Sequence, residues 1–536
     1  MNEQQPTTIP TEPRIPATKT EPKRQRGGPD FGINASDGIV VDTKPNAALG
    51  IDIGTHTTSA AAFFDGAVHF IEPSRMRSTI YISEERKVFV GMSPDDAKSD
   101  GIFIDGIKPL LGSDYNVQVG RTTRWNAIDC MSQILSGARA YAQRQLSMDV
   151  TKAVLTVPHT FNARQRKLLK SCAEKAGLQP IALIHETTAA ALNYCFENER
   201  DNCTLMVVSM GAAFLSVSLI DVHNKVVEVK YTSGEVWLGG TSFDERIERW
   251  LRQYIEEIGS SFDQTDSIAH VKIKAACEES KLRLLGGQFN RYGLPCAPPF
   301  TAKNPLTSAT IHLALLRLND LSDDKKELEL KGSVFESLTS DILQNICHCV
   351  EDVSSVAARD GIKPERVLFV GNATRAPFLW STIAKAACKG VTPDAENENC
   401  DLYAAAGASL YAALLTKQLL EWVVWDTLTI PIGVEAANGQ FKTLISKDTP
   451  LPVIVHHSVE MPESGRLKLK FVQGNDVIDE IVIKDASAGL PRPRKVEAAI
   501  HVHHDGTVSY SARDLELGVN LSVDVDAEEP VLVELA

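Results

Sequence analysis

Residues 47 to 415 alternate between apolar segments with the length of strands and longer amphipathic segments with the period of helices. The strand-like segments include KAVLTVP and RVLFVGN, and the helix-like segments include NARQRKLLKSCAEKAG and VKIKAACEESKLRLL. Alternation of this kind is typical of sheets covered by helices. The pattern therefore predicts an α/β domain, or a pair of them, over this region.

A short apolar segment follows that region. Four consecutive large apolar residues, Trp422 to Trp425, stand between Glu421 and Asp426. Such residues are unlikely to stay solvated between two domains, so we predict an apolar interdomain linker at residues 416–428 that docks on the preceding α/β domain or on a partner. An edge strand of the following module is the alternative interpretation.

The remainder of the chain has no convincing helical pattern. RLKLKFV and AAIHVHHDGTVSYSA alternate apolar and polar residues with the period of a strand, and Asp505-Gly506 is typical of a tight hairpin turn. We predict an all-β module, a sandwich, at residues 429–536.

Composition narrows the class of protein. The chain has 536 residues, a net charge of -14 and ten cysteines, none of them spaced as CxxC. These values exclude a disulfide scaffold and a chain-wide basic footprint for DNA. The longest uncharged segment, residues 204–220, is 17 residues long and too short to span a membrane. We expect reduced cysteines and a cytoplasmic location.

The first 45 residues differ from the rest. They contain seven of the 26 prolines and six charges of each sign, with almost no apolar periodicity. We expect a disordered tail at residues 1–45, because so little apolar surface is available for burial.

Two strand–turn–strand segments resemble each other and start 157 residues apart: GIDIGTHTTSAAAF and VVSMGAAFLSVSLI. Each turns at a glycine, Gly54 or Gly211, and the residue two before it is Asp52 or Ser209. A glycine turn lets backbone N–H groups approach phosphate oxygens, and a neighbouring carboxylate can hold hydrated Mg²⁺. Asp52, Gly54 and Thr55 fit that chemistry, although an ordinary hairpin is the favoured interpretation of a single such turn taken alone.

Two further glycine turns favour the functional interpretation. WLGGTSFDER follows the second strand–turn–strand segment, and VLFVGNATRAP follows a later strand. Glycine turns at strand ends in an α/β protein indicate a phosphate and nucleoside cleft between two lobes.

These segments together resemble the heat-shock protein 70 (DnaK-type) chaperone family. GIDIGT, KAVLTVPHTFNARQR, IHETTAAALNY, WLGGTSFDER, CEESKLRL, VLFVGNATRAP and the apolar linker occur in the family's order across residues 47 to 525. The resemblance implies an actin-like nucleotide-binding domain at 46–415, with lobe I at about 46–203 and lobe II at about 204–415. It also implies a peptide-holding sandwich. The family's helical lid would follow, and since the sequence ends at Ala536 we expect none.

The resemblance also implies site residues for ATP or ADP with Mg²⁺. It assigns Asp52, Gly54 and Thr55 to the first phosphate turn, with Asp52 holding the metal through water, and it assigns Lys108 to orienting an attacking water beside the acidic Glu186. It assigns Gly239 and Gly240 to nucleotide binding, Glu278 and Lys281 to the adenine side, Gly371 and Arg375 to the nucleoside loop, and Asp401 to a contact near the cleft. Taken alone, Lys108 before Pro109 would be interpreted as a surface lysine, but its place in the ordered series of motifs favours the site.

The departures from the family gather at the second phosphate turn. Where the family has Asp, three glycines and Thr, this chain has Ser209, Gly211, Ala212, Ala213 and Phe214. The metal-side carboxylate is missing, and an apolar ring replaces a hydroxyl. The other departures are Thr187 for a proline, His56 for a threonine, Asn372 for a glycine, and Leu282 and Leu285 for polar residues near the adenine.

The sequence thus predicts a divergent, lidless chaperone or co-chaperone of this family that binds ATP and hydrolyses it weakly or not at all. It resembles the atypical member of ribosome-associated complexes, which implies a J-domain partner, ribosomes or nascent chains, and extended peptides. An active ATP-dependent peptide-binding chaperone is the alternative within the family. From other classes, a nucleotide-free scaffold would keep the fold without the cleft chemistry, and an actin-fold kinase would have no use for the linker and sandwich.

Overall fold

The computed structural model describes most of the chain between residues 48 and 525. The described residues are 48–93, 96, 101–119, 123–262, 267–284, 308–375, 383, 391–394, 399–435, 441–484 and 494–525. Residues 1–37 form one unit and residues 38–536 another. The predicted tail at residues 1–45 lies outside the described residues, and everything below concerns the second unit.

The first large sheet has the strand order β11-β10-β1-β2-β3, with β4 paired to β2. Strands β1, β10 and β11 run parallel, and β2 returns antiparallel to β1. Helices α1 and α2 pack together, and their apolar residues join those of the sheet in one core. The elements are β1 (Ala48–Ile53), β2 (Thr57–Phe64), β3 (Ala67–Phe70), β4 (Met76–Arg77), β10 (Lys152–Val157), β11 (Gln179–His185), α1 (Ala127–Leu146) and α2 (Ala163–Lys175).

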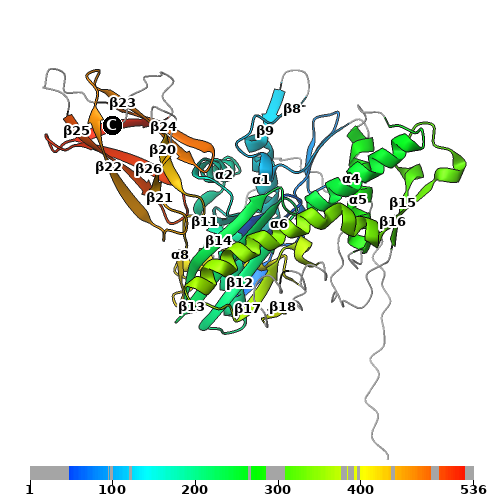
Figure 1. The fold of residues 1–536 in the computed structure, drawn as a ribbon, viewed down its shortest axis with the longest axis horizontal. Coiled ribbons are helices and arrows are strands. Elements are labelled where there is room, and N and C mark those ends of the chain that lie inside the picture. Colours follow the sequence, from blue (N-terminus) through cyan, green and yellow to red (C-terminus); the bar gives the residue numbers. More distant parts are fainter. Residues whose placement is uncertain are drawn as a thin grey trace, which may run out of the picture. The chain divides into compact units, whose positions relative to one another are not determined.

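The second large sheet repeats this order as β18-β17-β12-β13-β14, followed by β19. Strands β12 and β17 run parallel, and β13 returns antiparallel to β12, as β2 does to β1. The long helix α6 packs on β13 and β14, where Figure 1 shows it running across the sheet. The elements are β12 (Asn202–Met210), β13 (Phe214–His223), β14 (Val226–Val236), β17 (Arg366–Val370), β18 (Thr392–Asp394), β19 (Val423–Trp425), α4 (Gly240–Glu257), α5 (Ser267–Leu284) and α6 (Gly332–Arg359).

The α/β region also contains three small sheets and several short 3₁₀ helices. Three short strands form one sheet, two form a hairpin, and two more form a ribbon that packs on α5. They are β5 (Ile80–Ile82), β6 (Val88–Val90), β7 (Ile102–Ile104), β8 (Asn116–Val119), β9 (Thr123–Asn126), β15 (Ser308–His312) and β16 (Glu327–Lys331), with 3₁₀ helices η2 (Lys108–Leu110), η3 (Leu313–Leu315), η4 (Asp323–Lys325) and η5 (Asn372–Arg375).

The C-terminal strands form an antiparallel sheet of order β21-β20-β23-β24-β27-β26-β25-β22 around its own apolar core. Strand β27 pairs with β24 on one side and β26 on the other, which joins the two halves of a sandwich. The strands are β20 (Ile432–Glu435), β21 (Phe441–Ile445), β22 (Val453–Met461), β23 (Arg466–Gln473), β24 (Asp476–Lys484), β25 (Arg494–Val502), β26 (Val508–Asp514) and β27 (Asn520–Val525). The predicted fold class is confirmed, and among the described residues no helix follows the sandwich strands.

Helices α3 (Glu186–Glu197) and α8 (Tyr403–Leu415) lie on the faces of the two large sheets that α6 and α1 leave free. They approach each other at backbone distance, because a Cβ on Gly407 would lie 1.7 Å from the carbonyl oxygen of Ala189. A Cβ on Gly50 of β1 would lie 2.0 Å from the backbone nitrogen of Ser409. The run of alanines in both helices is what permits this contact.

The apolar linker forms strand β19, which pairs in parallel with β14 at the edge of the second sheet. Trp422 is buried and Val424 is half-buried against the same core, whereas Val423 and Trp425 point outward and are 44% and 52% exposed. The segment predicted to dock therefore does so, and it extends a sheet of the α/β region instead of the sandwich.

A buried polar chain connects α2 to the end of β11, to the linker and to the turn between β25 and β26. Arg166 donates to the backbone oxygen of Asp505, 3.0 Å away, and to Nε2 of His185, 2.6 Å away. Because a guanidinium only donates, Nε2 of His185 accepts and its Nδ1 carries the proton. That Nδ1 donates to Asp426 over 2.7 Å, and Thr188 donates to the second carboxylate oxygen over 3.2 Å.

A second histidine lies against the first, with ring centroids 4.9 Å apart. Nδ1 of His159 is 3.1 Å from the carbonyl oxygen of Ser233, which makes it the donor. Nε2 lies 2.9 Å from the hydroxyl of Thr187 and 3.1 Å from that of Ser218, and it accepts from one of these two hydroxyls, which are hydrogen-bonded to each other over 2.7 Å. Burial lowers the pKa of His159 to about 3, so the ring is neutral. Thr187, a departure from the family's proline, thus has a hydrogen-bonding role.

We predict that Gly407→Ala lowers stability by roughly 1–3 kcal/mol, because the new methyl group meets backbone that cannot move aside. Thermal unfolding measures this. Gly211→Ala is the control, since a Cβ there meets nothing within 4 Å. Equal melting temperatures for the two variants would contradict the backbone contact.

We also predict that Val424→Asp detaches β19 from β14, because it places a charge in a half-buried apolar site. The rate of chymotryptic cleavage near Trp422 should rise severalfold. Val423→Asp is the matched control, since this side chain points outward, and its cleavage rate should match the wild type. Increased cleavage in both variants, or in neither, would show that side-chain burial does not hold the strand.

Candidate functional site

The two similar segments of the sequence form the same turn. In the first, the N–H of Gly54 donates to the carbonyl of Thr57 over 3.0 Å, and in the second the N–H of Gly211 donates to the carbonyl of Phe214 over 3.1 Å. Asp52 is the penultimate residue of β1, and Ser209 is the penultimate residue of β12. The internal similarity is therefore a structural repeat, one copy in each large sheet.

The glycine turn of WLGGTSFDER is tied to the second of these turns. The N–H of Gly240 donates to the carbonyl of Gly211 over 2.9 Å, and that of Thr241 donates to the carbonyl of Ala212 over 2.8 Å. A Cβ on Gly239 would lie 2.5 Å from that last oxygen, so the position requires glycine. The turn also starts α4.

The third glycine turn follows β17. Gly371 has φ +90°, and a Cβ there would lie 2.5 Å from the carbonyl oxygen of Met210. Both features require glycine. Arg375 ends the adjoining 3₁₀ helix, and its side chain lies outside the described residues.

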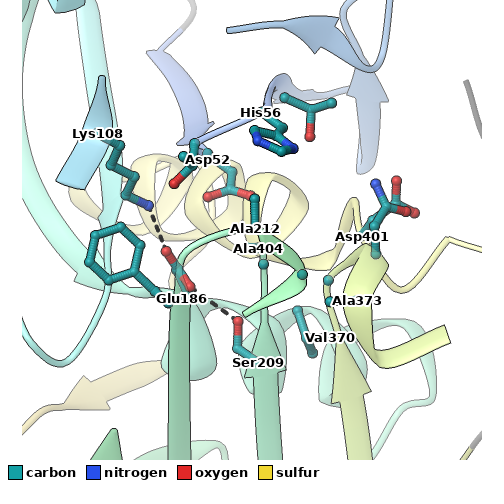
Figure 2. A pocket seen from close by; sticks show the side chains of 18 of the residues that line it. Asp52, His56, Lys108, Glu186, Ser209, Ala212, Val370, Ala373, Asp401 and Ala404 are labelled. Atoms are coloured by element: carbon teal, nitrogen blue, oxygen red, sulfur yellow. Dashed lines mark hydrogen bonds and ion pairs between the residues drawn. The ribbon is translucent and has the colours of Figure 1, made fainter. Parts of the chain in front are cut away.

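These turns surround one cleft, shown in Figure 2. Of the residues predicted for the site, ten line it together: Asp52, Gly54, Thr55, Lys108, Glu186, Gly240, Glu278, Lys281, Gly371 and Asp401. The departures His56, Ser209, Ala212, Phe214, Leu282 and Asn372 line it as well. Leu285 lies outside the described residues.

At the base of the cleft, Glu186 joins a lysine to a serine. Nζ of Lys108 donates to one carboxylate oxygen over 2.7 Å and Ser209 donates to the other over 3.1 Å (Figure 2). Lys108 is only 2% exposed. Glu186 is the first residue of α3, where the helix dipole favours a carboxylate. The alternative of Lys108 as a surface lysine is therefore wrong.

Asp52 faces the same space from the first turn. Burial, and then the charge of Glu186, raise the pKa of Asp52 to about 6, while Lys108 and a hydrogen bond from Thr156 lower it less. The ionised form of Asp52 is therefore disfavoured in this site. A positively charged ligand beside it would stabilise the ionised carboxylate.

Phe214 does not point freely into the cleft. Its ring is 4% exposed and packs edge-on against Phe161, with centroids 5.8 Å apart. Both it and Ala213 belong to the core of the first sheet, although they follow a strand of the second. Nζ of Lys108 lies 5.5 Å from the ring centroid. The second turn is thus anchored in the first lobe by an apolar side chain.

On the opposite wall of the cleft, the ammonium group of Lys281 is bound by protein oxygens. It donates to Asp244 over 2.7 Å and to the carbonyl of Gly240 over 3.0 Å. Burial raises the pKa of Asp244 to about 7 despite this lysine. Nδ1 of His56 lies 3.9 Å from Glu278, which brings the two walls close at this point.

Two partners were missed by the sequence reasoning. Asp401 is held by the guanidinium of Arg75, with one N–O distance of 2.9 Å, and Lys281 by Asp244. Asp244 lies within the segment WLGGTSFDER, but its pairing with Lys281 depends on α5 packing beside α4. Arg75 is 326 residues from Asp401, and nothing local in the sequence relates them.

Comparison with known proteins agrees with this geometry. The family model described as Hsp70 protein matches residues 111–532. The chain belongs to the Hsp70 family. Among its relatives is the chaperone protein DnaK of Thermosipho africanus (strain TCF52B), 29% identical over 516 residues, which are 90% of this chain and 80% of that protein. The DnaK of Mesomycoplasma hyopneumoniae (strain 232) is 25% identical over 498 residues, 89% of this chain and 78% of that protein.

None of the described helices of this Hsp70-family protein is long and apolar enough to cross a membrane.

We predict that Asp52→Asn raises the stability of the ligand-free protein at pH 7.5 by roughly 1–3 kcal/mol, because a buried ionised carboxylate is removed. The folded pKa of about 6 lies above the ordinary 3.8. The stability that the protonated group contributes is therefore complete below pH 3.8 and lost as pH rises through 6. The gain of the variant should vanish at pH 4.

Thermal melts at the two pH values measure this difference, and Asp65→Asn, on an exposed turn, is the control. The same melts with added MgATP should show a smaller ligand-induced shift for Asp52→Asn than for the wild type. A variant less stable than the wild type at pH 7.5 would show that Asp52 is favourably bound in the ligand-free protein.

Proposed function

We propose that this Hsp70-family protein is a divergent chaperone or co-chaperone that binds ATP or ADP in the cleft and hydrolyses ATP weakly or not at all. One observation supports this most directly. Where the first turn presents Asp52, the second presents Ser209, whose hydroxyl is already bound to Glu186. A single carboxylate therefore remains at the two turns to organise a hydrated metal ion.

The residues fit a nucleotide at one turn and not at the other. The turn at Gly54 and Thr55 offers backbone N–H groups to phosphates, and Asp52 would hold Mg²⁺ through water. At the second turn, Ala212 and Ala213 replace glycines, and Phe214 brings an apolar ring. When bound, Mg²⁺ would offset phosphate charge.

The remaining roles follow the family. Lys108 and Glu186 would position a water, and their mutual ion pair holds both in place. Glu278 and Lys281 would lie beside the adenine and Gly371 beside the nucleoside, together with Gly239, Gly240 and Arg375. Asp401, which is paired with Arg75, would make a contact near the cleft.

A nucleotide-free scaffold is the second candidate. It is favoured by Phe214, which ties the two lobes together through apolar contacts that need no ligand, and by the closed pairing of Lys108 with Glu186. The family match extends through the linker and sandwich strands. That extent counts against the actin-fold kinase.

We further propose a cytoplasmic J-domain co-chaperone as partner, with ribosomes or nascent chains and extended peptides as further ligands. The relatives are chaperones by name, and β19 docks beside the cleft-bearing sheets. Purification of the protein at native levels, followed by identification of its partners, tests this. The absence of both J-domain and ribosomal proteins from the purified material would refute it.

We predict that the wild type binds ATP, and that its single-turnover hydrolysis is far slower than that of an active DnaK. A variant with Ser209→Asp, Ala212→Gly, Ala213→Gly and Phe214→Thr restores the family's turn. It should hydrolyse ATP about tenfold faster or more, since 1.4 kcal/mol of transition-state stabilisation suffices for that factor.

Calorimetry with and without Mg²⁺ measures binding in the same preparations. Adding Lys108→Ala to the restored variant is the control, because activity from a contaminating chaperone would survive that change. Wild-type turnover at the rate of an active DnaK, abolished by Lys108→Ala, would establish the active chaperone instead. Absence of any nucleotide binding would establish the scaffold.

A further inference from the structure

Two buried cysteines meet where the first lobe passes into the second. Sγ of Cys195 lies 3.5 Å from Sγ of Cys203, and both are free thiols. Their residues are 0% and 6% exposed. This separation is within reach of a sulfur–sulfur bond after a small movement of either side chain.

The local backbone brings the two thiols together. Helix α3 ends at Glu197, the chain reverses through a turn in which Glu199 has φ +50°, and β12 begins at Asn202. The N–H of Arg200 donates to the carbonyl of Cys195 over 2.9 Å, which fixes the turn against the end of the helix. The turn between α3 and β12 therefore positions the two thiols next to each other.

The two thiols are chemically different. The hydrogen bond from the Cys195 thiol lowers the pKa of Cys203, whereas the hydrogen bond and burial raise the pKa of Cys195. Cys203 is also the more accessible of the two, at 6% exposed against 0% for Cys195. Cys203 is therefore the sulfur that a small oxidant would reach first.

We propose that Cys195 and Cys203 are a redox-modification site, which a hydroperoxide converts to a reversible intramolecular disulfide. The Cys203 sulfur attacks hydrogen peroxide, the O–O bond breaks, and a sulfenic acid and water form. The Cys195 sulfur then attacks the Cys203 sulfur, the S–O bond breaks, and a second water leaves with the last thiol proton. Two thiols are oxidised and one peroxide is reduced to two waters.

The bond would act on the candidate cleft through two rigid elements. Cys195 is near the end of α3, whose first residue is Glu186, and Cys203 is near the start of β12, whose penultimate residue is Ser209. Glu186 and Ser209 are hydrogen-bonded at 3.1 Å. The disulfide would close the other end of this pair of elements, so we expect the oxidised protein to melt at a higher temperature. The chemistry itself does not depend on the proposed function.

The experiment uses the folded full-length protein and hydrogen peroxide. Thiols are blocked with N-ethylmaleimide before denaturation, and the protein is digested with trypsin without reduction. Arg200 lies between the two cysteines, so cleavage there leaves the disulfide joining peptides 176–200 and 201–225. We expect this cross-linked product, a loss of two free thiols, and their full recovery with dithiothreitol.

Cys195→Ser and Cys203→Ser should each abolish the product and the rise in melting temperature. Cys277→Ser, which removes an equally buried thiol elsewhere, should leave both unchanged. The proposal is overturned if no cross-linked peptide forms in the folded protein. It is also overturned if Cys203 is oxidised to sulfinic acid without pairing, or if the thiol loss persists in the two serine variants.

Discussion

The backbone contact between α3 and α8 is the constraint on which the cleft depends. Gly407 approaches Ala189 so closely that no side chain fits between them, and Gly50 holds β1 against α8 in the same way. These contacts fix the distance between the two sheets from within. Since Glu186 begins α3 and Asp52 lies next to the end of β1, the same packing sets the separation of the two acidic side chains in the cleft. Small residues that do not line the cleft therefore determine its geometry.

The second constraint is apolar. Phe214 begins strand β13 of the second sheet, but its ring packs in the core of the first sheet, against Phe161. The contact between the second turn and the first sheet therefore consists of protein side chains alone.

Much of this arrangement could be predicted from the sequence, because repeated glycine turns and strand periods are local signals. Such patterns predict the two copies around Gly54 and Gly211, the docking linker and the sandwich. The family resemblance adds how these parts follow one another along the chain. The pairing of Arg75 with Asp401 could not be predicted, since neither residue carries a local signal for the other. Nor could the buried position of Phe214, because the sequence shows a lost hydroxyl but not the core that receives the ring. The domain boundaries and the roles of the site residues stay predictions.

Helix α3 connects the cleft to the linker within three residues. Glu186 binds Lys108 and Ser209 on one side, and Thr188, with the preceding His185, binds Asp426 on the other. A shift of the helix start that changed the first set of bonds would strain the second, since all of them are buried. Replacing either set by water is costly in such an environment. The hydrogen bonds of His185 to Arg166 and Asp426 place its proton on Nδ1. This ring therefore adds a directed polar contact to the strand pairing and apolar packing that hold the linker.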